Sequence, residues 1–214
     1  MNISTTCDMD ERDNIAERRQ CESARMGPLR RNSHAVHFYK DSQSLAQVAA
    51  SFLSEGIRAG ERVVIVSTPT HFAAIAKAVE RLGFDPAQLK KSGKWIAFDA
   101  RRTLSSLRAA GGRIDLTRFK VQFVDVVGDW YTSNPGLSMR AYGEMVDLLY
   151  RDGDIAGALQ LEELWTDLAA VHKFPMLCAY AVNSFFKEPR GSSRFSDVCR
   201  HHTHVIGAIP ERAI

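Results

Sequence analysis

The chain has 214 residues, 45% of them hydrophobic, which is typical of one globular domain with a terminal extension. The formal net charge is +3, and no basic segment alternates with aromatic residues, so direct nucleic-acid binding is not expected. No apolar segment approaches the roughly 20 residues that span a bilayer, and the N-terminus lacks the apolar core of a signal peptide. We therefore expect a cytosolic protein whose 4 cysteines are free thiols.

The N-terminal 33 residues differ in composition from the rest of the chain. Acidic residues and arginines alternate there, and almost no apolar residue is available for burial. We expect residues 1–33 to form a mobile charged arm, or to fold only against a partner. Residues 34–210 are expected to form the folded domain, because short β-rich segments alternate there with amphipathic helices.

The domain contains apolar segments of the kind that form buried strands, at 35–39, 61–68, 94–100, 137–145 and 175–182. Segments with apolar residues at helical spacing lie between and after them, at 44–60, 71–83, 101–112, 116–134, 145–153, 154–174 and 192–205. Asp154 can cap the helix at 154–174, and the last helix would place Cys199 and His202 on one side. The alternation predicts an α/β fold with a mainly parallel central sheet and helices on both faces.

HFYKDSQSL, residues 37–45, joins the first strand to the first helix, where many nucleotide-binding proteins carry a glycine-rich phosphate loop. The segment has no glycine, and neither GxxxxGK[ST] nor GxGxxG occurs in the chain, so no functional phosphate loop is expected. Two interpretations remain: a gate beside a ligand site, or a helix start capped by Asp41 or Ser42, which is the commoner outcome. A residual nucleotide-binding protein that uses Lys40 and Glu144 stays an open alternative.

Two glutamates occupy positions that suggest a site. Glu144 follows a predicted inner strand, where its side chain would enter the ligand crevice of an α/β protein or stabilise the start of the next helix. Glu162, in LEELW, shares a helix side with Ala158 and Trp165, which predicts partial burial. A half-buried carboxylate has a raised pKa or a partner, and Arg140 is a candidate partner.

No catalytic motif is apparent. GxSxG and HExxH are absent, and no carboxylate pair has catalytic spacing, so we expect no enzyme activity. A metal or haem redox sensor is an alternative, and its ligands would be His37, Cys178, Cys199 and His202. The local ligand spacing among them is the CxxH of CRHH, which is weak evidence, so we expect no bound metal or other cofactor.

Several segments together resemble one known family. The resemblance is carried by HFYKDSQSL, FLSEGIRAGERVVIVST, KSGKWIAFDA, RAYGEMVDLLYRDG, LQLEELWTDL, FPMLCAYA and FSDVCRHHTHV. In this order they are similar to a MEDS domain, the sensory domain named for methanogens, methylotrophs and the DcmR regulator. The similarity covers about residues 34–206, and GEMVDLL, LEELW and LCAY are its most distinctive parts.

The resemblance implies a RecA-like three-layer sandwich, related to KaiC-like ATPases, that has kept the sheet and lost the phosphate loop. It also implies a non-enzymatic sensor of small organic compounds. Such a sensor passes its signal to a histidine kinase, an anti-sigma factor, a response regulator or a DNA-binding region in transcription control. No such output domain is apparent here, so we expect a separate partner protein or an output through residues 1–33, with a homodimer as the default state.

We expect a small organic ligand to bind at the carboxyl edge of the strands, where aromatic side chains give contact area and charged groups give orientation. The expected ligand-binding residues are His37, Tyr39, Lys40, Arg140, Glu144, Glu162, Trp165, Cys178, Tyr180 and His202. To signal, the ligand must bind one conformation more tightly than another. A protein-interaction module without a small ligand is a further alternative.

Overall fold

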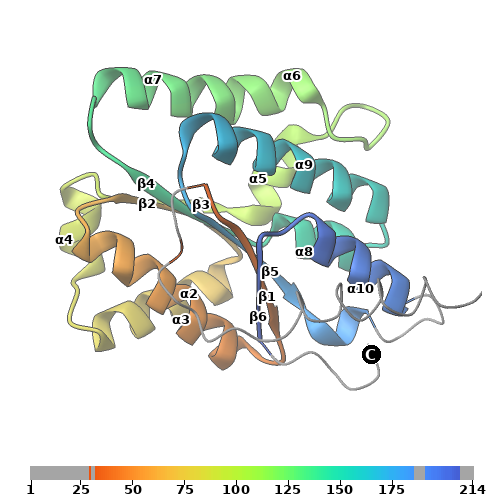
Figure 1. Cartoon of the computed structure of the whole chain (residues 1–214), viewed down its shortest axis with the longest axis horizontal. Coiled ribbons are helices and arrows are strands. Elements are labelled where there is room, and N and C mark those ends of the chain that lie inside the picture. The colour runs from red at the N-terminus through yellow and green to blue at the C-terminus, as the bar shows by residue number, and fades with distance from the viewer. Residues whose placement is uncertain (1–28, 30–31, 186–190, 208–214) are drawn as a thin grey trace, which may run out of the picture.

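In the computed structural model, the structure describes Leu29 and residues 32–185 and 191–207. The predicted charged arm therefore lies almost entirely outside the described residues. The chain is built around a six-stranded sheet in which neighbouring strands run parallel, in the order β3-β2-β4-β5-β1-β6 (Figure 1). The strands are β1 (His34–Tyr39), β2 (Arg62–Ser67), β3 (Trp95–Asp99), β4 (Met139–Gly143), β5 (Met176–Ala181) and β6 (His204–Ile206).

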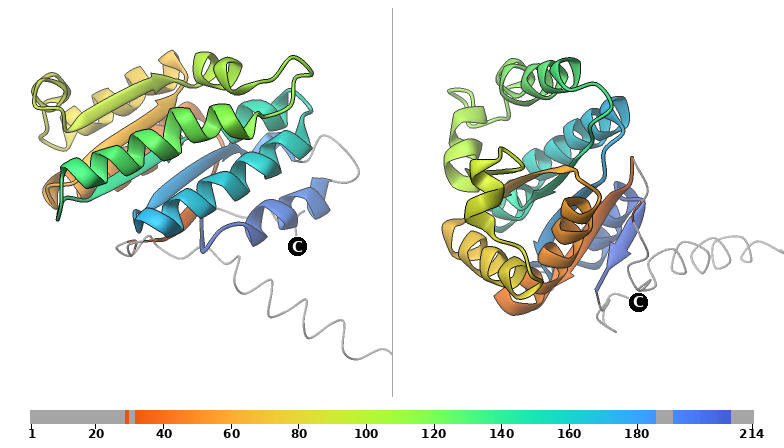
Figure 2. Two further views of the ribbon diagram at one scale, coloured as in Figure 1. Left: turned by 90° about the horizontal axis from the view of Figure 1, so that it is seen from above. Right: turned by 90° about the vertical axis from the view of Figure 1, so that its left-hand side faces the viewer.

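Helices cover both faces of the sheet, which confirms the predicted three-layer α/β sandwich (Figure 2). One face, called here the α2 face, is covered by α2 (Ser42–Arg58) and α3 (Pro69–Arg81), with α4 (Pro86–Lys91) beside β3. The opposite face, called the α9 face, carries α5 (Ala100–Leu107), α6 (Leu116–Phe119), η1 (Lys120–Asp125), α7 (Val126–Ser133), α8 (Met145–Arg151), α9 (Ile155–His172) and α10 (Gly191–Arg200). A short 3-10 helix, η2 (Val182–Ser184), follows β5.

Side-chain alternation along β1 decides which residues meet on each face. Val36 packs in the core of the α9 face, whereas Tyr39 packs in the core of the α2 face. β1 pairs with β5 so that Val36 lies opposite Cys178. His34 therefore projects to the same face as Cys178, and His37 projects to the other face.

Asp41 caps α2, which confirms the interpretation of the segment after β1 as a capped helix start. Its Oδ1 accepts a hydrogen bond from the backbone N of Ser44 at 2.7 Å, and its own backbone N donates to Oγ of Ser44 at 3.4 Å. This arrangement is a capping box. The Asp41 carboxylate thereby takes an amide hydrogen that a bound phosphate would otherwise accept.

The C-terminal part of the domain differs from the single helix predicted at 192–205. α10 ends at Arg200, and β6 then pairs with β1, with Val205 opposite Val36. Between them, the backbone N of Thr203 donates to the carbonyl of His34 at 2.6 Å. Without β6, the outer edge of β1 would present unpaired backbone groups, and this is the physical reason for the short strand.

The helix predicted at 116–134 forms, but it contains a π-helical turn. α6, η1 and α7 follow one another without a break, and η1 is the π-helical part. Lys120 and Asp125, five positions apart, form an ion pair with 2.6 Å between Nζ and Oδ1. π-helical turns are rare and frequently occur at functional sites. This one contributes Phe123 to the wall of the cavity described below.

Candidate functional site

The predicted ligand-binding residues do not form one site, because the sheet separates them. Tyr39, His37 and Arg140 lie on the α2 face, while Glu144 and Lys40 lie at the carboxyl ends of β4 and β1. The remaining five lie on the α9 face: Glu162, Trp165, Cys178, Tyr180 and His202. Their role in binding a ligand stays a prediction, but the geometry indicates which of them can act together.

Arg140 is an ion-pair partner on the α2 face. Its Nε donates to Oε2 of Glu61 at 2.8 Å, and its Nη1 donates to the carbonyl oxygen of Phe52 at 2.6 Å. The guanidinium carbon also lies 4.7 Å from the centre of the Phe52 ring. The predicted pairing of Arg140 with Glu162 is therefore wrong, because β4 directs Arg140 to one face of the sheet and α9 holds Glu162 on the other.

Glu144 is buried at the carboxyl edge of the sheet, where α3 begins. One carboxylate oxygen accepts a hydrogen bond from the backbone N of Thr68, and the other lies 2.5 Å from Nδ1 of His71. The hydrogen bond to Glu144 raises the pKa of His71 and outweighs the opposite effect of burial. Oγ of Ser42 lies 3.2 Å from Nε2 of His71, so the start of α2 is connected to Glu144. Sequence reasoning did not identify His71, although it follows a predicted strand end.

A second buried carboxylate, that of Asp147 in α8, lies at the same edge of the sheet, beside the last residues of β1 and β5. Its Oδ2 accepts a hydrogen bond from the hydroxyl of Tyr39 at 2.9 Å, and its Oδ1 accepts one from the backbone N of Ala181 at 3.0 Å. Burial raises the pKa of Asp147. Both buried carboxylates at this edge are thus bonded to groups of the protein itself, whereas Lys40 is exposed beside them.

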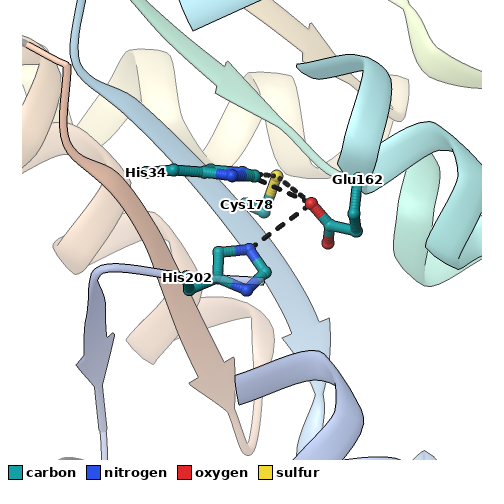
Figure 3. A group of neighbouring side chains, drawn as sticks. All are labelled: His34, Glu162, Cys178 and His202. Atoms are coloured by element: carbon teal, nitrogen blue, oxygen red, sulfur yellow. Dashed lines mark hydrogen bonds and ion pairs between the residues drawn. The ribbon is translucent and has the colours of Figure 1, made fainter. Parts of the chain in front are cut away.

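On the α9 face, four side chains with metal-ligating atoms converge at the inner surface of α9 (Figure 3). We call them the buried polar cluster: His34 of β1, Glu162 of α9, Cys178 of β5, and His202, which follows α10. Oε2 of Glu162 lies 3.3 Å from Nε2 of His34, 3.4 Å from Nε2 of His202 and 3.4 Å from Sγ of Cys178. Sγ of Cys178 lies 3.2 Å from Nε2 of His34. All four side chains are removed from solvent.

Glu162 is held by a hydrogen bond outside the cluster. The hydroxyl of Tyr180 donates to Oε1 at 2.7 Å, so Oε2 is the oxygen that faces the other three side chains. Burial acts to raise the pKa of Glu162, but the neighbouring His202 and His34 lower it by more. The pKa of Glu162 is therefore well below its ordinary value, and the carboxyl is ionised at neutral pH. Burial and the adjacent His202 lower the pKa of His34, and burial raises the pKa of the Cys178 thiol.

The two imidazole rings are oriented by contacts at their other nitrogen. Nδ1 of His202 donates to the carbonyl oxygen of Val198 at 2.7 Å. Nδ1 of His34 lies 2.8 Å from Oγ1 of Thr166, whose own proton is donated to the carbonyl of Glu162 at 2.9 Å. Because that hydroxyl proton is already used, Nδ1 of His34 is the donor to Thr166. In their neutral forms both rings therefore present the lone pair of Nε2 to the cluster.

The cluster overlaps in part with the residues of the metal-sensor alternative. Cys178 and His202 belong to it, but His37 projects to the α2 face, where its Nδ1 lies 3.2 Å from the carbonyl of Ile206. Cys199 is not one of the four donors. The structure has His34 and Glu162 in the cluster in place of the predicted His37 and Cys199. The sequence did not indicate that either of them lies beside Cys178.

A cavity of about 40 Å³ lies beside the cluster, between the sheet and the helices of the α9 face. Its wall is almost entirely apolar and includes Phe123, Met145, Trp165, Leu168, Met176 and Cys178. The ring of Phe123, which belongs to the π-helical turn, packs edge-on against Trp165 with 4.6 Å between ring centres. Trp165 lies one helical turn after Glu162, so α9 contributes to both the cavity and the cluster.

The model of one protein family matches residues 33–203: MEDS, the methanogen/methylotroph, DcmR sensory domain. The chain belongs to the MEDS family. The match confirms the resemblance of the sequence to this family, and it identifies the described domain as a sensory domain. No curated protein matches the chain. Within the described part of the chain, no helix has the length and apolar character needed to cross a bilayer.

In this MEDS domain, the cavity and the buried polar cluster share one side chain. The thiol of Cys178 donates to Glu162 in the cluster, and the same residue forms part of the cavity wall. A molecule in the cavity would therefore contact a group that is bonded to the cluster. This shared residue connects an apolar binding space with a polar centre.

Proposed function

We propose that this MEDS domain is a cytoplasmic, non-enzymatic sensor that binds a small, mainly apolar organic molecule and regulates a partner signalling or transcription protein. The ligand would bind in the cavity of the α9 face, beside Trp165 and Cys178. The observation that carries the proposal is the cavity itself, because well-packed protein cores contain few voids larger than a water molecule. The membership of the chain in a sensory family supports the same function.

The size and lining of the cavity define the class of ligand. One water molecule needs roughly 10–15 Å³ of such space, so about 40 Å³ accommodates roughly three non-hydrogen atoms. The wall offers mainly aromatic, aliphatic and thioether groups, and the thiol proton of Cys178 is already donated to Glu162. Saturated or halogenated hydrocarbons of roughly one to three carbon atoms fit these properties.

The helix that contains the π-helical turn contacts the cavity on one side and solvent on the other, so it could transmit a conformational change from the ligand to the protein surface. Phe123 contributes to the cavity wall, whereas Val121 and Val126 on the outer side of the same helix are 60% and 57% exposed. A ligand that binds more tightly when Phe123 moves would shift the population of helix conformations, and the exposed side would move with it. We propose that the partner protein recognises this change on the outer side of η1 and α7.

Methionine methyl groups allow a direct test, because the three methionines of the described residues all line the cavity. They are Met139, Met145 and Met176. The chain would be labelled with 13C-methyl methionine and titrated with hydrocarbons and halogenated hydrocarbons of graded size, with benzene as an oversized member. We expect saturable shifts of these three methyl signals with the smallest compounds and a loss of binding as size increases.

Gly143 offers a variant that fills the cavity without strain. It lines the cavity, and a Cβ added to it meets no heavy atom within 4 Å. Gly143→Ala should weaken binding of the probes at least about tenfold, because the new methyl group occupies ligand space. Gly111→Ala is the matched control, since its Cβ is equally free but Gly111 lies away from the cavity wall. The absence of saturable shifts, or equal binding by both variants, would contradict the proposal.

A further inference from the structure

The buried polar cluster consists of donor atoms that bind transition-metal ions. Two imidazole nitrogens, one thiol sulfur and one carboxylate oxygen lie within 4.8 Å of one another. Imidazole and thiolate are the preferred ligands of zinc and related divalent ions, and carboxylate oxygens complete many such sites. The sensor proposed above does not need these four side chains to converge, so their arrangement requires a separate explanation.

The distances within the cluster fit tetrahedral coordination. Zinc binds nitrogen and oxygen at about 2.0–2.2 Å and sulfur at about 2.3 Å, so donor atoms at the corners of a tetrahedron lie about 3.3–3.7 Å apart. Four of the separations in the cluster are 3.2, 3.3, 3.4 and 3.4 Å. A metal ion could therefore be accommodated by small side-chain shifts, without rearrangement of the backbone.

The hydrogen positions also favour a metal ion. His202 and His34 each present a lone pair at Nε2, because their Nδ1 atoms donate to Val198 and Thr166. Nε2 of His202 makes no hydrogen bond within the described part of the chain, although its side chain is fully buried and lies 3.4 Å from Glu162. When both rings are neutral, three electron-pair donors share the single thiol proton of Cys178. A cation between them would satisfy every donor.

The charges of the cluster balance with a divalent ion. When Cys178 binds as a thiolate, its proton leaves to solvent, and the thiolate and the Glu162 carboxylate together carry two negative charges. Two neutral imidazoles add none, so a divalent cation gives a neutral centre. Neutrality matters here, because an uncompensated charge in a site with this degree of burial is strongly unfavourable.

We propose that the buried polar cluster binds one divalent transition-metal ion of the zinc type in tetrahedral geometry. All four positions are supplied by the protein, so the site is closed and holds the metal as a structural centre. Tyr180 and Thr166 are positioning residues, since the first orients the Glu162 carboxylate and the second orients the His34 ring. The ion would connect β1, β5 and α9 with the segment that leads into β6.

Cobalt substitution tests the site in the full chain. The chain would be freed of metal with a chelator and titrated with Co²⁺, while absorption and metal content are recorded. We expect one ion per chain, d–d bands of tetrahedral cobalt, a thiolate-to-cobalt charge-transfer band, and displacement of cobalt by Zn²⁺. Cys178→Ser should abolish the charge-transfer band, and His34→Ala should lower the affinity more than about tenfold.

Matched variants separate this site from binding elsewhere. Cys199→Ser and His37→Ala change a cysteine and a buried histidine outside the cluster, and both should bind cobalt as the parent chain does. Thr166→Val removes only the group that orients His34, so it should fold, retain the charge-transfer band and bind the metal roughly 10 to 100 times more weakly.

Two results would overturn the proposal. One is the absence of a stoichiometric ion after titration. The other is equal affinity of Cys178→Ser and Cys199→Ser for the metal. Gly143→Ala should keep the metal while losing the cavity ligand, so the failure of this proposal and the failure of the sensor proposal are distinguishable.

Discussion

The hydroxyl of Tyr180 donates a 2.7 Å hydrogen bond to Oε1 of Glu162, and both side chains are fully buried. This contact leaves Oε2 as the oxygen that faces His34, His202 and Cys178. The tyrosine therefore determines which oxygen of the carboxylate takes part in the cluster. Its removal should disturb the cluster without changing any of the four donors.

Tyr180→Phe should lower the free energy of unfolding by about 1.5–3 kcal/mol, because a buried carboxylate loses a hydrogen bond. Tyr142→Phe is the matched control on the neighbouring strand. Tyr142 is equally buried, but its hydroxyl makes no hydrogen bond among the residues that the structure describes, so its removal should cost nothing. Chemical denaturation measures both values, and equal losses would show that the bond to Glu162 does not stabilise the fold.

Local composition predicts the strands of the sheet apart from β6, and the α-helices apart from the short α4. β6 has three residues and no recognisable periodicity, so its pairing with β1 depends on the tertiary fold. Asp154 caps α9 through the backbone N of Gly157, at 2.9 Å, as the sequence predicted. The cap of α9 needs no knowledge of long-range contacts, whereas β6 depends on them entirely.

The site depends on strand register, which no local pattern contains. Helical periodicity predicts partial burial of Glu162, and the structure buries it completely, but the periodicity does not identify the partners of its carboxylate. His34 lies 144 residues from Cys178 in the chain, and they meet because β1 pairs in parallel with β5. His34 and Val36, two positions apart, project to the same face of the sheet. This alternation indicates that His34 can meet Cys178 only after the register of β1 and β5 is known. His37, one position out of phase, projects to the other face.

Gly56 provides a test of the ion pair on the α2 face. A Cβ at this position would lie 2.7 Å from Oε2 of Glu61 and 2.8 Å from Nε of Arg140. Gly56→Ala should therefore destabilise the chain by roughly 1–3 kcal/mol, despite the better helix propensity of alanine. In Gly128→Ala the nearest contact would be an ordinary 3.8 Å, so this control should gain up to about 1 kcal/mol. Thermal unfolding of the two variants should move in opposite directions.

The pair formed by His71 and Glu144 should make stability depend on pH. The hydrogen bond to Glu144 raises the pKa of His71 above the unfolded value of 6.5, so folding is favoured by the protonated ring. This stabilisation is complete below the unfolded pKa and is lost as pH rises through the folded pKa. The difference in unfolding free energy between the parent chain and His71→Gln should accordingly shrink as pH rises from the unfolded pKa of 6.5 through the raised folded pKa.

His172 supplies a control with the opposite sign. Burial lowers the pKa of His172, so its contribution to stability is lost as pH falls rather than as it rises. The difference between the parent chain and His172→Gln should shrink on acidification below about pH 6.5. A stability difference for His71→Gln that stays constant across the pH range would contradict the role assigned to the Glu144 pair.

Cys178 should couple the cavity to the metal site, because it belongs to both. A small hydrocarbon that enters the cavity contacts the cobalt-bound thiolate, so the charge-transfer band should shift in energy or intensity as the ligand binds. By linkage, the metal should change the affinity for the ligand by the same factor as the ligand changes the affinity for the metal. Titration of each in the presence of the other measures this factor, and a factor of one would mean that the sites are independent.

The crystal structure of the chain under xenon pressure tests the proposed binding space most directly, since apolar protein cavities accept xenon. We predict a xenon atom in the cavity between Trp165, Phe123 and Met176, and its loss or displacement in Gly143→Ala. No xenon at this position, or the same xenon density in Gly143→Ala, would contradict the proposal that this MEDS domain binds its ligand there.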